Sequence, residues 1–488
     1  MKFIIMCTNK AIKKSALFFA GTFIPAAIGF ISTPIFTRYF TTSEYGVNTL
    51  IDTSFGYLNI LLFGLISNIV WRYYNDYKNK GEIDIFFGLV STLARTFELF
   101  IVAVVSCISL FSRFDGYAKC LIGAKAISVI TVAYVSIYLV ILFLDGKVAA
   151  YNAIQIFNAI SNFAVIYLLT KFFGMRNIAM YISTIFYSLC SGAFLAWHFR
   201  KQKKTYLPAR KTIAILLPMI SYGVVAILTD FTHNILDSSD RYMVSLAKNV
   251  SAVGIYDKLY NVSNYLLVLF ITVFTNIFSP HVFRHLSKGD AKDFFKALLP
   301  VYVGVFLPLV LYYAVFSNTI CSILLPKEYA AWHFILSLIS LGCFFDRLVG
   351  FFPMMILRFS RPWFMAVGYG LAVLLNLILN AVLIPHLSLL GAAIGTVASY
   401  FAVFLFSTVA TGILSPEYFF KKGSRINLLF LIPLVECIAY LLIKKSIALP
   451  KMSCVVLAVL LAASYFGPYL YYTFVRNKEF IQLFEDNE

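Results

Sequence analysis

The sequence predicts an all-α, polytopic integral membrane protein with about fourteen transmembrane helices. Two features of its composition predict this class: 61% of the 488 residues are hydrophobic and only 13% are charged. A membrane-spanning helix needs about 20 apolar residues, so this composition suits about fourteen spans and leaves nothing for a soluble core. The third observation is that apolar runs follow one another along the chain, with connections of at most about 20 residues. A soluble enzyme, a collagen-like protein and a disordered chain are therefore excluded.

The predicted helices are apolar runs bounded by charged residues, Pro, Gly, Asn or Asp. The first run follows Lys13 and Lys14 without a small-residue cleavage site after it, so we expect an uncleaved helix. The fifth and thirteenth runs are the weakest. All four tryptophans lie at predicted span ends, as an interfacial aromatic belt requires. In chain order the runs are 15–37, 46–71, 85–111, 120–144, 148–170, 177–199, 213–236, 251–279, 297–318, 329–357, 363–384, 389–413, 426–443 and 452–474.

The positive charge of the chain predicts its topology. The sequence has 40 Lys and Arg against 22 Asp and Glu, and these bases lie mostly in short connections between apolar runs. This location indicates contact with membrane lipids and excludes nucleic acid as the partner. With a cytoplasmic N-terminus, 25 bases fall on cytoplasmic segments and 11 on the opposite side, so both termini are expected inside. The largest cluster, at 200–211, is interpreted as a topology anchor, with a lipid or partner contact as the alternative.

The sequence lacks the signatures of a metal site, a disulfide framework or a nucleotide-driven motor. The eight cysteines are scattered singly, with no CxxC and no Cys/His cluster. No GxxxxGK[ST] phosphate loop occurs, so an ATP-driven pump would need a second chain. We expect no cofactor, no metal and no enzyme activity.

A short internal sequence repeat divides the chain into two parts. The first span ends with Thr-Arg-Tyr at 37–39, and the seventh with Asp-Arg-Tyr at 240–242. A glycine follows the arginine in both copies, Gly46 after 8 residues and Gly254 after 13. Two-lobed bundles with parallel repeats are typical of alternating-access transporters that bind substrate between the lobes. We predict an N-lobe of six helices at 1–205, a C-lobe of six at 206–415, and two further helices with a short cytoplasmic tail at 416–488.

Three stretches of the chain carry a resemblance to a known family. The first runs from Lys-Ser-Ala-Leu at 14–17 through Pro-Ile-Phe-Thr-Arg-Tyr-Phe at 34–40 to Glu-Tyr-Gly at 44–46. The second joins Asp-Arg-Tyr-Met at 240–243 to Val-Gly-Ile-Tyr-Asp-Lys-Leu at 253–259. The third runs from Leu-Asn-Leu-Ile-Leu-Asn at 375–380 to Gly-Ala-Ala-Ile-Gly-Thr-Val-Ala-Ser-Tyr at 391–400. Together they resemble bacterial polysaccharide-transporter proteins, the O-antigen type flippases of lipid-linked oligosaccharides. The loop at 386–390 departs from the family, which more often has a basic residue and a glycine there.

The resemblance implies a fold and an activity. The fold is that of the multidrug, oligosaccharidyl-lipid and polysaccharide exporters, in which two six-helix lobes form a V, here with two C-terminal helices outside them. The activity is transfer of undecaprenyl-pyrophosphate-linked oligosaccharide repeat units, O-antigen or a related surface polysaccharide, from the cytoplasmic to the periplasmic leaflet of the bacterial inner membrane. A polysaccharide polymerase and a chain-length regulator are the protein partners that such a role implies.

Intramembrane bases are the candidates for substrate binding. A pyrophosphate-linked glycan cannot cross about 30 Å of hydrocarbon unaided, because its charges and hydroxyl groups would lose their water. A flippase therefore needs a hydrated cationic cleft. Snorkelling to the interface is the alternative role for Lys258 and Lys125, and pairing with Asp257 is a further alternative for Lys258. For Arg38 and Arg241 the alternatives are anchoring of span ends or an outer gate. The candidates are Lys258, Arg95, Arg38, Arg241 and Lys125.

A second set of charged residues is assigned to ion coupling or gating. Arg95 and Glu98 are three residues apart, so they share a helix face and can form a closed or a switchable ion pair. Asp230 similarly shares a face with His233 and favours its imidazolium form, whereas a His hydrogen-bonded at the interface is the alternative. Two adjacent residues at 346–347 are expected to diverge and to find partners elsewhere in their lobe. The set comprises Glu98, Asp230, His233, Asp52, Asp240, Asp257, Asp346 and Arg347.

Helix breakers and the membrane potential suggest how transport proceeds. Pro25 in the first span, and Pro218 with Gly223 in the seventh, occupy matching places and are expected to be hinges, with static kinks as the alternative. One charge moved through 100 mV is worth about 2.3 kcal/mol, so exchange of H⁺ or Na⁺ against the glycan would drive export. Antiport is therefore our hypothesis.

Two other functions stay open at this point. A drug or cation antiporter of the same fold would need an acidic or aromatic cleft, whereas these spans hold bases as well as acids. A membrane polysaccharide polymerase or ligase would resemble this chain in hydropathy. Such enzymes usually carry a long periplasmic loop, which this sequence lacks.

Overall fold

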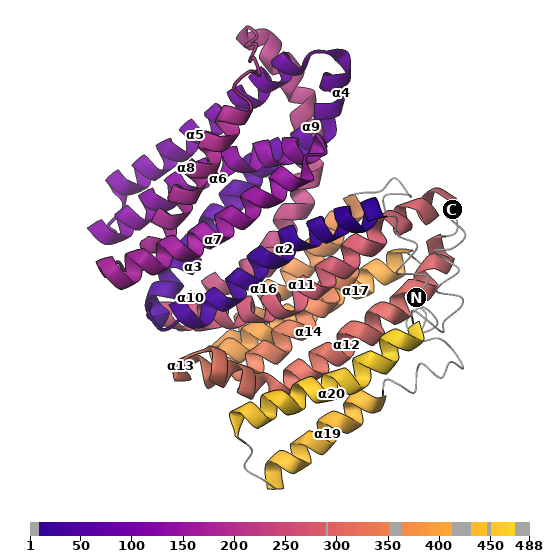
Figure 1. The fold of residues 1–488 in the computed structure, drawn as a ribbon. Coiled ribbons are helices and arrows are strands. Elements are labelled where there is room, and N and C mark those ends of the chain that lie inside the picture. The colour runs from indigo at the N-terminus through magenta and orange to yellow at the C-terminus, as the bar shows by residue number, and fades with distance from the viewer. Residues whose placement is uncertain (1–8, 289–290, 351–362, 412–430, 447–449, 474–488) are drawn as a thin grey trace. The chain divides into compact units, whose positions relative to one another are not determined.

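The structure is a computed structural model that describes residues 9–288, 291–350, 363–411, 431–446 and 450–473 (Figure 1). All regular elements in these ranges are helices, which confirms the all-α class. The chain divides into two compact units, of which the first is Thr8–Ser238 and the second begins at Ser239. The predicted grouping of 206–415 as one lobe differs from this division, because the helix Ala209–Ser238 packs with the first unit. The lobe boundaries therefore stay a prediction.

The first unit holds eight α-helices and one π-helical turn in its described residues. The π turn lies inside a continuous helical span, Thr42–Lys80, where the sequence predicts one uninterrupted run. The elements are α2 Asn9–Phe36, α3 Thr42–Asn59, η1 Ile60–Gly64, α4 Leu65–Lys80, α5 Ile83–Phe111, α6 Gly116–Leu144, α7 Val148–Phe173, α8 Ala179–His198 and α9 Ala209–Ser238.

The second unit continues with two short helices among the long ones. Its described elements are α10 Asp240–Ala247, α11 Val250–Lys288, α12 Ala291–Leu324, α13 Lys327–Ala330, α14 His333–Val349, α16 Trp363–Leu387, α17 Leu389–Thr411, α19 Leu431–Ser446 and α20 Lys451–Tyr471.

Each predicted span falls at least partly on a described helix. In the described residues nine helical stretches are long and apolar enough to cross a membrane. A tenth is obtained if the bent pair 209–224 and 227–247, which runs through α9 and α10, counts as one span. Their lengths suit the hydrocarbon core of a bilayer. The weak fifth run is one of the nine, whereas the weak thirteenth corresponds to α19, which has only 16 residues. A multi-pass membrane protein is thus confirmed, and the count of fourteen spans stays a prediction.

The core of the first unit is a cluster of apolar side chains around α4 and α5. Ile66 and Val70 of α4 and Phe86 of α5 are fully buried in it. Gly223 of α9 brings its own helix against the same cluster, because a Cβ at this position would lie 2.5 Å from a methyl carbon of Leu65. Close apolar packing therefore helps to hold α9 to α4 along this face.

In the second unit, α16 and α17 form a close hairpin. The helices turn at Ser388, and Gly391 and Gly395 form a GxxxG motif on α17. A Cβ on Gly391 would lie 2.5 Å from the carbonyl carbon of Leu383. Small residues at such spacing let two membrane helices approach closely.

Substituting Gly391 by Val is expected to destabilise the protein by about 1–3 kcal/mol, because the backbone of α16 has to move to accept the side chain. Thermal unfolding of the purified protein in detergent measures this effect. The control is Gly370→Val in α16, where a Cβ has no atom within 4 Å. Equal melting temperatures for the two variants would contradict the packing argument.

The two C-terminal helices α19 and α20 pack on α12. Pro308 has no N–H, so the carbonyl of Gly304, one turn earlier, lacks its helical hydrogen bond. The Tyr465 hydroxyl of α20 donates to this carbonyl at 2.8 Å. Glu436 of α19 accepts hydrogen bonds from the Tyr312 hydroxyl of α12 and, at 2.6 Å, from a serine of α20. The appended pair is thus attached to α12 by tyrosine hydroxyls as well as by apolar contact.

Candidate functional site

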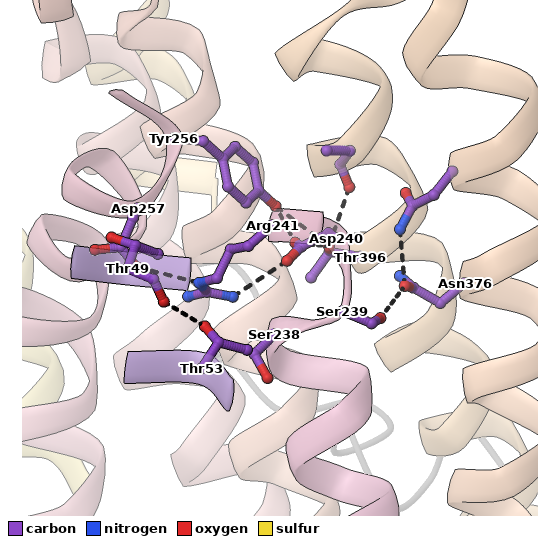
Figure 2. Close-up of polar contacts among 12 residues, drawn as sticks. Thr49, Thr53, Ser238, Ser239, Asp240, Arg241, Tyr256, Asp257, Asn376 and Thr396 are labelled. Carbon is purple, nitrogen blue, oxygen red and sulfur yellow. Dashed lines mark hydrogen bonds and ion pairs between the residues drawn. The ribbon is translucent and has the colours of Figure 1, made fainter. Parts of the chain in front are cut away.

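The most buried charges of the described chain lie at the start of the second unit, around Arg241 of α10 (Figure 2). Its side chain is 6% exposed, and its Nε and Nη1 atoms each lie 3.1 Å from a carboxylate oxygen, of Asp257 and Asp240 respectively. The guanidinium also stacks on the Tyr260 ring, 4.7 Å from its centroid. A buried base needs such partners, since an unpaired charge in a low-dielectric interior is costly.

Both acids of this group have further hydrogen-bond donors. Asp240 is fully buried and accepts from the Tyr256 hydroxyl at 2.6 Å and the Thr396 hydroxyl at 3.2 Å. Asp257 accepts from the Asn261 amide at 2.9 Å, and the Lys258 ammonium lies 3.6 Å from it. Two acids therefore face two bases. We call Asp240, Arg241, Tyr256, Asp257 and Thr396 the Arg241 cluster.

Two buried asparagines of α16 adjoin the Arg241 cluster. The Asn380 amide donates to the Asn376 carbonyl at 2.8 Å, and the Ser239 hydroxyl, next to Asp240 in the chain, donates to the same oxygen at 3.4 Å (Figure 2). Among the described residues, Asn376 Nδ2 and Asn380 Oδ1 have no hydrogen-bond partner. Leaving a buried polar atom unsatisfied costs about 1–3 kcal/mol. Asn376 Nδ2 needs a hydrogen-bond acceptor, whereas Asn380 Oδ1 needs a donor or a cation.

The first unit has a corresponding polar group on α3. Lys125 of α6 pairs with Asp52 of α3 at 2.8 Å and lies over the Tyr181 ring of α8, 5.4 Å from its centroid. The Asp52 side chain is 49% exposed, whereas the Lys125 side chain is only 20% exposed. The two predicted residues are therefore brought together, but Lys125 has a carboxylate partner.

A capping box begins α3 next to this pair. The Thr41 hydroxyl accepts from the Glu44 backbone, while the Glu44 carboxylate accepts from the Thr41 backbone N–H at 2.9 Å. Arg176, in the connection between α7 and α8, donates to Glu44 at 2.7 Å, which raises the pKa of the guanidinium. Asn177 donates to Asn48 at 2.7 Å and so joins the same connection to α3. These contacts tie α3 to the start of α8.

Arg95 and Glu98 do not form the ion pair that their spacing allows. Within the described residues, the exposed Arg95 guanidinium stacks on Tyr206, 5.5 Å from the ring centroid, and Glu98 accepts from the Tyr134 hydroxyl at 3.0 Å. Each side chain thus finds an aromatic partner on a neighbouring segment, which a spacing argument cannot foresee.

Asp346 and Arg347 correct a second expectation. The sequence predicts that they diverge, yet they also approach one another, with Arg347 Nε 3.4 Å from Asp346 Oδ2. The long arginine side chain can fold back along the helix end, so adjacency does not prevent the contact.

The remaining predicted residues lie as follows. Asp230 of α9 hydrogen-bonds the Asn68 side chain and interacts electrostatically with His233, as their shared face predicts. Arg38 lies beyond the end of α2, is exposed, and donates to the Pro34 carbonyl in the last helical turn. The five predicted bases divide between the units, three in the first and two in the second.

The predicted hinge residues lie inside helices. Pro25 is within α2 and Pro218 within α9. The stretches 209–224 and 227–247 differ by 44° in direction, so the bend falls between residues 224 and 227, close to Gly223. The close contact of Gly223 with Leu65 also gives this glycine a packing role. A hinge movement stays a prediction.

Sequence reasoning missed several members of these groups. The family resemblance includes Tyr256, Thr396, Asn376 and Asn380 but assigns them no role. Arg176 enters only the count of bases on each side of the membrane. One signal was available: two asparagines four residues apart in a long apolar run share one helix face, and polar groups inside a membrane helix require partners.

Comparisons with known proteins agree with this architecture. A family model described as "Polysaccharide biosynthesis protein" matches residues 35–333, more than half of the chain. A search of curated protein sequences finds no significant match. A structure of the lipid II flippase MurJ in an inward closed conformation aligns with a TM-score of 0.70 at 15% identity, covering 94% of this chain and 99% of that one.

Two transporter structures are similar as well. An inward-facing multidrug resistance transporter of the MATE family, in the MOP superfamily, aligns with a TM-score of 0.62 at 12% identity over 82% of this chain and 95% of that one. A mutant of the Vibrio cholerae MATE transporter VcmN gives 0.56 at 12% identity, covering 84% and 98%. With a helical membrane fold shared along nearly its whole length and a family model matching more than half of it, the chain belongs to the polysaccharide biosynthesis protein family.

Proposed function

We propose that this protein is a flippase for undecaprenyl-pyrophosphate-linked oligosaccharide repeat units, O-antigen or a related surface polysaccharide. It acts in the bacterial inner membrane, with both termini in the cytoplasm, and moves its substrate to the periplasmic leaflet by alternating access. The observation that carries the proposal is the combination of membership in the polysaccharide biosynthesis family with the fold of a lipid II flippase. Both point to a carrier of a lipid-linked glycan, not to an enzyme.

The intramembrane charges support this substrate class. Lys258 and Lys125 each lie beside a carboxylate and are 19% and 20% exposed. A base held this way can exchange its carboxylate for a phosphate oxygen without losing a charged partner. Arg95, exposed and stacked on an aromatic ring, offers a planar donor for the same purpose. Arg241 is less suited to direct contact, because two acids already neutralise it inside one unit.

For the coupling ion we propose the region of Asp240, Thr396 and Asn380. It offers a carboxylate, a hydroxyl and an amide oxygen that lacks a partner among the described residues. Oxygen ligands of this kind suit a hard cation such as Na⁺. Exchange of Na⁺ against the lipid-linked glycan would then couple export to the ion gradient.

Reconstitution into proteoliposomes tests the function and the coupling together. We expect the full-length protein to move an undecaprenyl-diphosphate oligosaccharide between leaflets, and the rate to fall when the Na⁺ gradient is collapsed. The drug-exporter alternative, which the similarity to MATE transporters keeps in view, predicts movement of a quaternary ammonium compound instead. Failure to move the glycan rejects the flippase, whereas glycan transport that ignores both Na⁺ and H⁺ gradients rejects antiport alone.

A further inference from the structure

The connection between α8 and α9, residues 199–208, is a fixed basic segment on the first unit, and we call it the basic connector. The Thr205 backbone N–H donates to the Asp84 carbonyl of α5 at 2.9 Å, and the Gln202 amide donates to the Asp84 side chain at 2.5 Å. Gly88 permits this approach, because a Cβ there would lie 2.0 Å from the Thr205 carbonyl oxygen. The ring of Phe199 packs against the rings of Phe87 and Tyr138.

The bases of the connector lie between these anchored residues. Arg200, Lys201, Lys203 and Lys204 are all exposed. In the part of the chain that the structure describes, none of the four has an acidic partner. Other surface bases at this end of the unit differ, since Arg72 and Lys78 pair with Asp76 and Asp145. Four uncompensated positive charges are therefore displayed on a backbone that is already held in place.

The position of the connector matches the lipid headgroup layer. It begins directly after His198, the last residue of the apolar span α8. Trp197, at the end of this span, is 58% exposed, and the Arg200 guanidinium lies over its ring, 5.2 Å from the centroid. Exposed tryptophan at a span end is typical of the membrane interface, and basic residues next to a span attract anionic lipids.

We propose that the basic connector is a binding surface for the phosphate groups of anionic bilayer phospholipids. The bases are spread along five residues and all face water, so they suit several headgroups side by side and do not enclose a single diphosphate. Because the connector is pinned to α5 beforehand, little of its conformational freedom is lost when lipid binds. By the predicted topology this surface faces the cytoplasmic leaflet.

The test uses the full-length protein, purified in detergent and stripped of lipid. Phosphatidylglycerol is the anionic probe and phosphatidylcholine the neutral reference, and native mass spectrometry measures bound lipid. The variant Lys201→Gln/Lys203→Gln/Lys204→Gln is compared with the control Arg113→Gln/Lys327→Gln/Lys445→Gln, which removes three exposed bases elsewhere. We expect the phosphatidylglycerol dissociation constant to rise roughly fivefold for each connector base removed, and the control to stay within about twofold of wild type.

Two further variants separate charge from folding. Replacing the same three lysines by arginine is expected to preserve lipid retention. The single change Lys204→Gln, which leaves every anchoring contact intact, is expected to show a partial loss even if the triple variant folds poorly. Equal losses in the connector and control variants would overturn the proposal, because net charge alone would then explain binding. Undecaprenyl diphosphate is offered as a second probe. If the connector variant loses this probe but retains phosphatidylglycerol unchanged, the proposal is also overturned, because the substrate headgroup is then the ligand of the connector.

Discussion

Replacing Arg241 by methionine is expected to destabilise the protein by about 3–5 kcal/mol, enough to remove most folded protein from the membrane. The substitution leaves Asp240 fully buried and Asp257 nearly so, each without its guanidinium partner. Asp257 keeps Lys258 at 3.6 Å, but Asp240 loses the guanidinium 3.1 Å away, and removing one partner of a buried ion pair costs far more than the pair itself contributes. Thermal unfolding in detergent, followed by size-exclusion chromatography of the heated sample, measures the loss.

The matched control for this change is Arg72→Met. Arg72 and Asp76 form an exposed pair at 2.9 Å with about half of each side chain in water. Exposed pairs of this kind contribute only about 0.3–0.5 kcal/mol, so this variant should melt close to wild type. If Arg241→Met and Arg72→Met have the same melting temperature, the Arg241 cluster is not a structural ion group and our interpretation of it is wrong.

Substituting Lys258 by Ala is expected to abolish surface polysaccharide while the protein stays folded in the membrane. Stability is retained because Asp257 keeps Arg241 at 3.1 Å and Asn261 at 2.9 Å as partners. Transport is lost because the partly exposed ammonium is the base of this unit that we expect to contact phosphate. Immunoblotting of membranes and a polysaccharide gel from a complemented deletion strain measure the two quantities separately.

Lys258→Arg tests whether the charge itself matters. It keeps a positive group beside Asp257 and should restore at least part of the polysaccharide. Wild-type polysaccharide in the Lys258→Ala strain would remove Lys258 from the proposed mechanism. A loss of membrane-inserted protein in that strain would instead make its role structural.

The candidate site was only partly accessible to sequence reasoning. Asp240, Arg241 and Asp257 could be selected as charges near a span end, but not as one group, because 16 residues and a short helix separate the arginine from Asp257. Arg95 and Glu98 had the spacing of a pair and formed none in the described structure, since Tyr206 and Tyr134 come from other segments. Asp346 and Arg347 were expected to diverge but also contact each other. Pairing between charges depends on which helices pack, and helical spacing alone does not contain that information.

The amino-acid sequence was sufficient to establish that the protein is all-helical and multi-pass, and to locate its long helices. The free energy of transferring an apolar run into hydrocarbon is a local property, because it is a sum over the residues of the run. The partners of each intramembrane charge became known only from the folded chain. A base is neutralised or accessible according to the side chains that neighbouring helices bring within about 4 Å, where Coulomb energies are large. Arg241 and Lys258 illustrate this: both are bases near Asp257, yet Arg241 lies between two acids and is 6% exposed, whereas Lys258 lies beside one acid and is 19% exposed.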